Sequence, residues 1–184
     1  MNRPSFFEGA GFALLAALLG SGLYLILTAA MTTWTAWRLV VAAVSLAYLI
    51  YLLTRSGSRI GQVTTVVAWA GITLAAWWMT PSITTFVLIQ TLTIWLVRSL
   101  YFHSGVLAAL ADAALCGLAL AAGSVALART GSLAAGLWCY FLVQALFAVI
   151  PAGWPLKQAP PQQDRFELAH RNAEAIVRRH FSSL

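Results

Sequence analysis

The chain has 184 residues, of which 61% are hydrophobic and only 9% are charged. Soluble domains are about half apolar and about a quarter charged, so this composition excludes an ordinary water-soluble protein. Eleven basic and five acidic residues give a formal net charge of +6, but the basic residues are scattered singly and form no stripe. Nucleic acid is therefore not an expected partner.

Six apolar runs fill the first 150 residues. A hydrocarbon core about 30 Å thick needs roughly 20 apolar residues in a helix, and each backbone polar group in it must be hydrogen-bonded within its own segment. The sequence therefore predicts an all-α integral membrane protein, with a bundle of six transmembrane helices over residues 1–150. The runs cover about residues 9–28, 37–53, 63–78, 83–97, 105–127 and 133–150, and the second and fourth are the weakest.

The distribution of basic residues predicts the orientation of this bundle. Short cytoplasmic loops accumulate Lys and Arg. With six crossings, nine basic residues fall on the side of the two chain ends, and Arg38 and Arg129 fall on the other. Both termini are therefore predicted to be cytoplasmic. Ten arginines against one lysine in an alanine- and leucine-rich chain hint at a GC-rich bacterial genome, and the expected location is therefore the bacterial inner membrane.

Asp112 is the single carboxylate within an apolar run. An ionisable group at that depth costs on the order of a few kcal/mol unless it is paired or neutral, so it needs partners. Gln90 and Thr91 on the fourth run and Gln144 on the sixth lie at about the same depth. The side chain of Arg98, at the cytoplasmic end of the fourth run, is long enough to reach inward. We expect these residues to form one polar layer across three helices.

This layer allows two interpretations. In the first, the carboxyl of Asp112 is protonated or paired with Arg98, and it holds the fourth, fifth and sixth helices together. In the second, Asp112 is a proton or cation site lined by Gln90, Thr91 and Gln144. The first is favoured because transporters usually contain broken helices or paired repeats, whereas these runs contain no internal proline and no visible repeat.

The fifth run carries small residues at four-residue spacing, which let the backbones of neighbouring helices approach closely. We expect this stripe to be a packing face of the helix. Its members are Ala109, Ala113, Gly117 and Ala121, with Ala108, Cys116, Ala119 and Gly123 beside them.

The chain changes character after residue 150. Residues 151–163 are rich in proline and glutamine and predict a stiff linker. A helix is predicted over residues 164–184, because Asp164 and Glu167 have the spacing of a capping box. We expect this amphipathic cytoplasmic helix to dock on a protein surface, and adsorption to the inner leaflet is the alternative. Its apolar stripe consists of Phe166, Ala169, Ala173, Ile176, Val177, Phe181 and Leu184.

Residues that would indicate a reaction are missing from the expected places. No histidine or lysine lies inside an apolar run, which removes haem ligands and a retinal Schiff base. The two cysteines form no CxxC pair, and the spacing of His170, Glu174 and His180 does not suit a metal. We therefore expect no metal, no cofactor and no enzymatic activity.

The predicted function is that of a non-enzymatic subunit or assembly factor of an inner-membrane complex. Its partners would be the lipid bilayer and other membrane or cytosolic protein subunits. Association with further copies of the same chain is an additional alternative. The alternative is a small proton- or cation-coupled transporter or channel that uses Asp112. A membrane enzyme acting on lipid or quinone is a third class, because apolar substrates need few diagnostic residues.

Overall fold

The computed structural model describes residues 6–56, 61–102 and 106–149. These segments contain six α-helices and no strand, which confirms the predicted number of helices. The predicted linker at residues 151–163 and the predicted helix at residues 164–184 lie outside the described residues. The elements are α1 (Phe6–Ala30), α2 (Thr33–Ser56), α3 (Gln62–Met79), α4 (Ile83–Phe102), α5 (Val106–Thr130), α6 (Leu133–Ala145) and a 3-10 helix, η1 (Leu146–Val149).

Within the described segments, four helices are long and apolar enough to cross a membrane, namely α1, α2, α4 and α5. They indicate a membrane protein. The second and fourth runs were expected to be the weakest, and this expectation was wrong: α2 and α4 continue through Arg55 and Arg98 to 24 and 20 residues. A long arginine side chain can turn toward a polar group without interrupting the helical backbone. The shortest helix is instead α6, with 13 residues.

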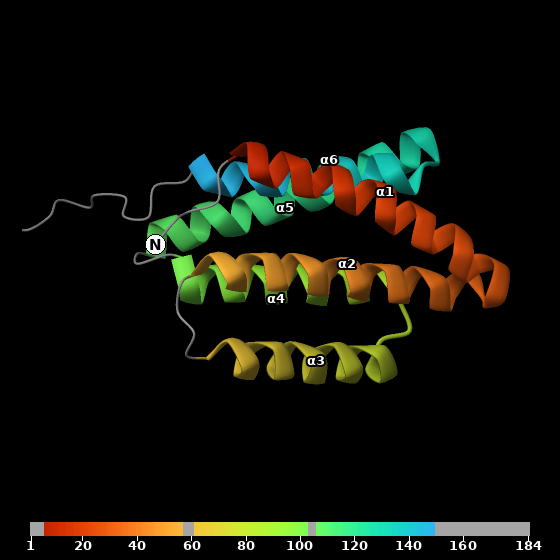
Figure 1. The fold of residues 1–184 in the computed structure, drawn as a ribbon, viewed down its shortest axis with the longest axis horizontal. Helices are drawn as coiled ribbons and strands as arrows, with labels where there is room; N and C mark the ends of the chain where they lie inside the picture. Colours follow the sequence, from red (N-terminus) through yellow and green to blue (C-terminus); the bar gives the residue numbers. More distant parts are fainter. Residues whose placement is uncertain (1–5, 57–60, 103–105, 150–184) are drawn as a thin grey trace, which may run out of the picture. The chain divides into compact units, whose positions relative to one another are not determined.

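The helices run alternately in opposite directions (Figure 1). The turns that join α1 to α2, α3 to α4 and α5 to α6 lie at one end, which we call the hairpin end. The start of α1 and the end of η1, where the described residues begin and end, lie at the opposite end, which we call the terminal end. The described part of the chain therefore starts and finishes on the same side of the bundle.

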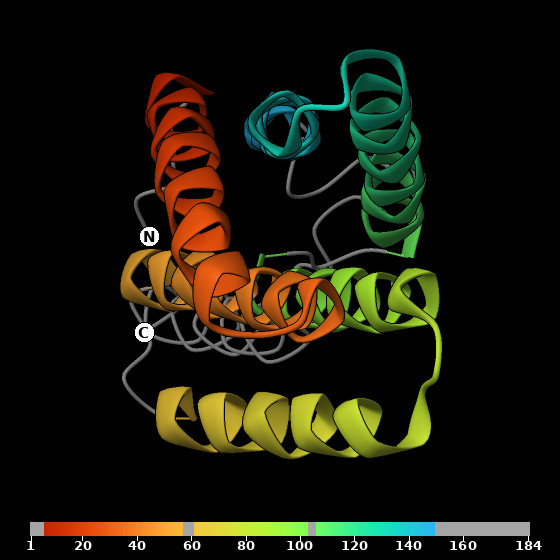
Figure 2. The same ribbon diagram turned by 90° about the vertical axis from the view of Figure 1, so that its right-hand side faces the viewer.

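The helices form three layers, which are visible in two perpendicular views (Figures 1 and 2). The first layer contains α1, α6 and α5, with α6 in the middle; the second contains α2 and α4; the third is α3 alone. Rings fill the space between the first two layers, where Phe12 of α1 lies 5.2 Å from Tyr48 and 5.4 Å from Phe141 between ring centroids. The packing of the first layer on the second brings α4 close to α5 and α6, so that side chains of these three helices can form hydrogen bonds with one another.

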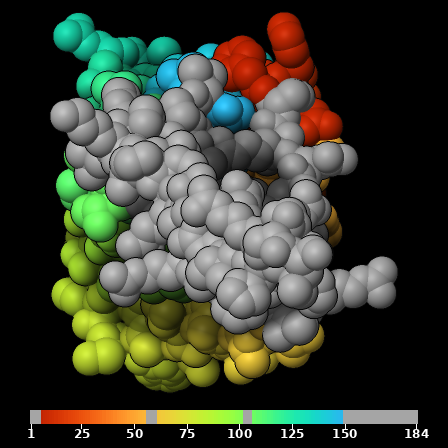
Figure 3. Space-filling view, turned by 90° about the vertical axis from the view of Figure 1, so that its left-hand side faces the viewer, coloured from red at the N-terminus to blue at the C-terminus, as the bar shows by residue number. Residues whose placement is uncertain are grey.

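Small residues allow α6 to approach both of its neighbours. A Cβ on Gly9 of α1 would lie 2.6 Å from the Cβ of Ala145, and a Cβ on Gly123 of α5 would lie 3.0 Å from the carbonyl oxygen of Gly136. Figure 3 shows the first turns of α1 and the end of α6 next to each other at the terminal end. Close backbone approach is a main source of helix association in a membrane, where burial of apolar surface gives little.

Candidate functional site: a buried ion pair and an apolar cavity

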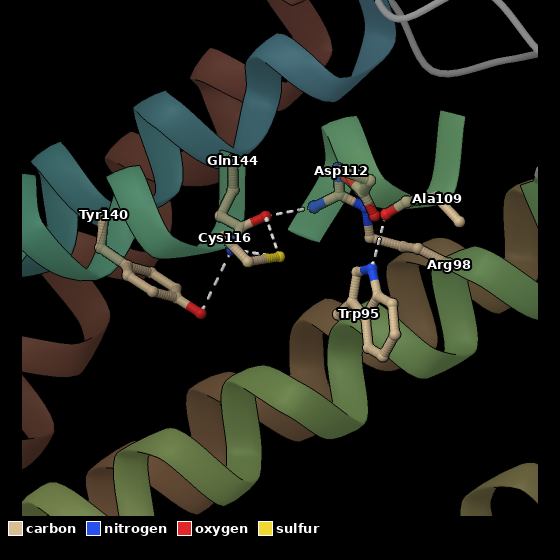
Figure 4. A network of polar contacts seen from close by, with 7 residues as sticks. All are labelled: Trp95, Arg98, Ala109, Asp112, Cys116, Tyr140 and Gln144. Atoms are coloured by element: carbon tan, nitrogen blue, oxygen red, sulfur yellow. Dashed lines mark hydrogen bonds and ion pairs between the residues drawn. The ribbon is translucent and has the colours of Figure 1, made fainter. Parts of the chain in front are cut away.

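Arg98, Asp112 and Gln144 meet in the terminal half of the bundle, where α4, α5 and α6 converge (Figure 4). All three side chains have no exposed surface. One amino group of the Arg98 guanidinium forms an ion pair with Oδ1 of Asp112, and the other donates to Oε1 of Gln144. We call this group the polar cluster. It joins three helices through one guanidinium.

Neighbouring groups complete the surroundings of the ion pair. The ring of Phe147 in η1 lies 4.0 Å from Cζ of Arg98, a distance at which the ring face attracts a cation. Beside it, the indole N–H of Trp95 donates to the carbonyl oxygen of Ala109 at 2.9 Å and ties α4 to α5. Each buried charge is costly to desolvate, so the pair is stable only while both partners remain.

A chain of hydrogen bonds leads from the polar cluster toward the hairpin end. Nε2 of Gln144 donates to Oη of Tyr140 at 3.4 Å and to Sγ of Cys116 at 3.6 Å. Oη of Tyr140 in turn lies 3.0 Å from Oγ1 of Thr91. Of the residues predicted to surround Asp112, the structure therefore joins Arg98, Gln144 and Thr91 to it in one network. Sequence reasoning overlooked Tyr140, although it precedes Gln144 by one helical turn on the same face.

Gln90 was expected in the same layer, but the structure places it in a different contact. Its Oε1 accepts from the indole N–H of Trp69 at 3.0 Å, and its Nε2 donates to Oγ1 of Thr73 at 2.9 Å. Gln90 and Thr91 are consecutive on α4, so their side chains point about 100° apart around the helix axis. Thr91 consequently faces α6, whereas Gln90 holds α3 against α4.

The predicted packing stripe on α5 also differs from the observed packing face. Ala109 and Ala113 are half-buried, while Gly117 and Ala121 are exposed, and a Cβ on Gly117 would meet nothing within 4 Å. Asp112 must face α4 and α6, and this requirement rotates the helix so that the adjacent stripe is buried. The buried members of α5 are Ala108, Asp112, Cys116, Ala119 and Gly123.

Arg38 is a second buried arginine, which the sequence analysis used only in counting basic residues on the side opposite the two chain ends. It belongs to α2 and is 5% exposed. Its guanidinium donates to the carbonyl oxygens of Trp77, at 2.7 Å, and of Thr80, where α3 ends. The ring of Trp34 lies 4.6 Å from its Cζ. A cation bound to the last carbonyl oxygens of a helix interacts favourably with the helix dipole. Arg38 of α2 therefore holds the C-terminal end of α3 in place.

A cavity of about 380 Å³ lies in the hairpin half of the bundle, between α2, α4, α5 and α6. Its walls are mostly apolar and include Trp37, Val87 and Leu137. Thr91 and Tyr140, at the far end of the hydrogen-bond chain from Asp112, also line it. The polar cluster itself does not. The polar side chains on the walls are Ser45, Thr84, Gln90, Thr91, Ser124 and Tyr140.

The predicted partner-binding stripe of the C-terminal helix lies outside the described residues. Its members Phe166, Ala169, Ala173, Ile176, Val177 and Phe181 therefore stay a prediction from the sequence. In comparisons with models of protein families, with curated proteins and with solved structures, none matches this chain. Its function must be inferred from its own residues.

Proposed function

We propose that this chain is a non-enzymatic subunit or assembly factor of a bacterial inner-membrane protein complex. The observation that supports this best is the use of its buried charges. Arg98 binds Asp112 and Gln144, and Arg38 binds the end of α3, so each charge joins helices to one another. None of these four side chains lines the cavity. Such a bundle suits a scaffold that presents other surfaces to partners.

We further propose that both termini are cytoplasmic and that residues 164–184 form the docking helix. The nine-to-two distribution of basic residues supports the orientation. The start of α1 and the end of η1 lie at the same end of the bundle, which agrees with an even number of crossings. The docking role rests on the amphipathic pattern of the sequence, whose apolar stripe would fit a groove on a cytosolic or membrane partner.

A small proton- or cation-coupled transporter or channel is the second candidate. The hydrogen-bond chain from Asp112 through Arg98, Gln144 and Tyr140 to the cavity wall at Thr91 favours it. The full burial of Asp112 and its ion pair with Arg98 favour the structural role instead. A carboxylate that is already paired with a cation has less affinity for a second one.

Deleting residues 160–184 tests the docking proposal. The full chain and the deletion variant are each purified from the native membrane in a gentle detergent. We expect a protein partner to be retained by the full chain and lost by the variant, and an excess of a synthetic peptide of residues 160–184 should displace it. An identical set of co-purifying proteins with and without the segment would contradict docking through the tail.

A further inference from the structure

The cavity between α2, α4, α5 and α6 is open on one side. Of the described residues that line it, only Thr84, Leu88 and Ser124 are exposed, and they belong to α4 and α5. These two helices are tied together toward the terminal end, where Trp95 donates to the carbonyl oxygen of Ala109. Toward the hairpin end α5 diverges from α4 (Figures 1 and 2). The opening is therefore lateral, between the hairpin halves of α4 and α5, and we call it the slot.

The other walls of the cavity are closed by helix packing. A Cβ on Gly123 of α5 would lie 3.0 Å from the carbonyl oxygen of Gly136 and 3.0 Å from Cβ of Tyr140, both on α6. On α2, the lining residues Val44 and Ser45 are buried. The exposure of the lining residues thus places the entrance at the slot.

The surface beside the slot is apolar. Leu92 follows Leu88 by one turn on the same face of α4 and is 59% exposed. Val125 follows Ser124 on α5 and is 58% exposed. In a bundle that crosses a membrane, large apolar side chains with this exposure face the hydrocarbon. The slot therefore connects the cavity with the acyl chains of the surrounding lipid.

The interior of the cavity suits a hydrocarbon chain. No charged side chain is among the described residues that line it. At its inner end, Oγ1 of Thr91 lies 3.0 Å from the carbonyl oxygen of Val87 and 3.0 Å from Oη of Tyr140, so these hydroxyl groups are bonded within the protein. The amide of Gln90 bonds to side chains of α3. The walls thus offer mainly apolar contact.

The depth of the cavity is close to that of one leaflet. Its lining begins at Ile83 and Leu133, the first residues of α4 and α6, at the hairpin end. It reaches Thr91 on α4 and Phe141 on α6, and each of these spans is about 12 Å at the rise of an α-helix. One leaflet supplies half of a hydrocarbon core about 30 Å thick. A lipid whose headgroup lies at the hairpin end can therefore extend a chain to the inner end of the cavity.

We infer that the cavity holds one acyl chain of a membrane phospholipid, which enters through the slot from the leaflet at the hairpin end. The inference rests on the membrane location of the bundle. Its volume of about 380 Å³ lies in the range of small-molecule sites. Apolar cavities do not hold ordered water, and walls that face empty space lose dispersion contacts. An acyl chain restores these contacts, so it acts as part of the core between the two layers.

Photolabelling of the full chain in lipid nanodiscs tests this inference. The probe is a phosphatidylethanolamine with a diazirine at the methyl end of one acyl chain, and labelled residues are mapped by mass spectrometry. We expect labels on Val44 and Phe141, which line the cavity and are buried from the outer surface. We also expect labels on Leu18 of α1, which is 60% exposed and reports contact with the bilayer. Labelling of Leu18 without Val44 and Phe141 would overturn the inference.

Two substitutions at consecutive positions of α5 test the slot as the entrance. Ser124→Trp places a large ring in the slot and should remove the labels from Val44 and Phe141 while Leu18 stays labelled. Val125→Trp is the matched control, because Val125 is exposed but does not line the cavity, and it should keep all three labels. Equal labelling of the cavity in the two variants would contradict lateral entry.

A second probe distinguishes a phospholipid chain from a free apolar molecule. It is an alkane that carries the same diazirine and has no headgroup. If the alkane labels Val44 and Phe141 whereas the phospholipid probe does not, the cavity takes small free molecules and the inference is wrong. Labelling of the natural chain by the phospholipid probe decides this point even if Ser124→Trp fails to fold.

Discussion

Replacement of Asp112 with leucine is expected to lower the free energy of unfolding by about 3–5 kcal/mol, because it leaves the guanidinium of Arg98 buried without its counter-charge. Arg98→Leu should lower the free energy of unfolding by a smaller amount. A carboxyl left alone in an apolar site can bind a proton and become neutral, whereas a guanidinium stays charged. The double variant should recover most of the loss, since apolar side chains often replace a buried ion pair without destabilisation.

Unfolding titrations in mixed micelles measure the free energy of unfolding of the natural protein, the two single variants and the double variant, which together form a double-mutant cycle. Losses that simply add in the double variant would show that Arg98 and Asp112 do not stabilise each other. Asp112→Asn provides a further comparison with the transport alternative, because the amide keeps the size of the side chain but removes its charge. We expect reduced stability. A variant of native stability that has lost a measurable proton or cation flux would favour transport instead.

Two substitutions in the predicted C-terminal helix should have the largest effect on partner binding. Ile176→Asp combined with Phe181→Asp places two carboxylates on the apolar stripe, at a cost of several kcal/mol if both are desolvated without partners. We expect the protein to reach the membrane in normal amounts, because the apolar runs are untouched, and to lose its partner. Co-purification from membranes measures both quantities.

The matched control for this variant reverses two charges on the opposite face of the helix. Arg171→Glu with Glu174→Arg should bind the partner nearly as well as the natural sequence, because exposed ion pairs contribute little. If the charge-reversed protein lost the partner while the Ile176→Asp and Phe181→Asp protein kept it, the polar face would be the docking surface.

Much of the bundle could be predicted because hydrophobic runs are a direct consequence of the bilayer. The polar cluster was also predictable in outline, since Asp112 in an apolar run demands a partner and Arg98 lies within reach. The separation of Gln90 from Thr91 was not, because depth along a helix says nothing about rotation around its axis. That rotation follows from which neighbours pack, and these are set by the tertiary fold.

The contacts of Arg38 and the presence of the cavity could not be predicted from the sequence, for a related reason. Arg38 meets the carbonyl oxygens of Trp77 and Thr80 only because α3 returns beside α2. The cavity is lined by residues of four helices that are far apart in the sequence, from Trp37 of α2 to Phe141 of α6. Both features depend on distances between distant segments, whereas the sequence pattern reports only local order.

Labelling of single cysteines in intact cells tests the central claim, a six-crossing bundle with its tail in the cytoplasm. Cys116 and Cys139 are first replaced with alanine, and one cysteine is then introduced at Thr130, at the hairpin end, or at Ser58, in the predicted second loop. A membrane-impermeant maleimide should label Thr130→Cys in intact cells and should label Ser58→Cys only after the membrane is opened. Labelling of Ser58→Cys in intact cells would contradict the orientation, and with it the docking of a cytosolic partner by residues 164–184.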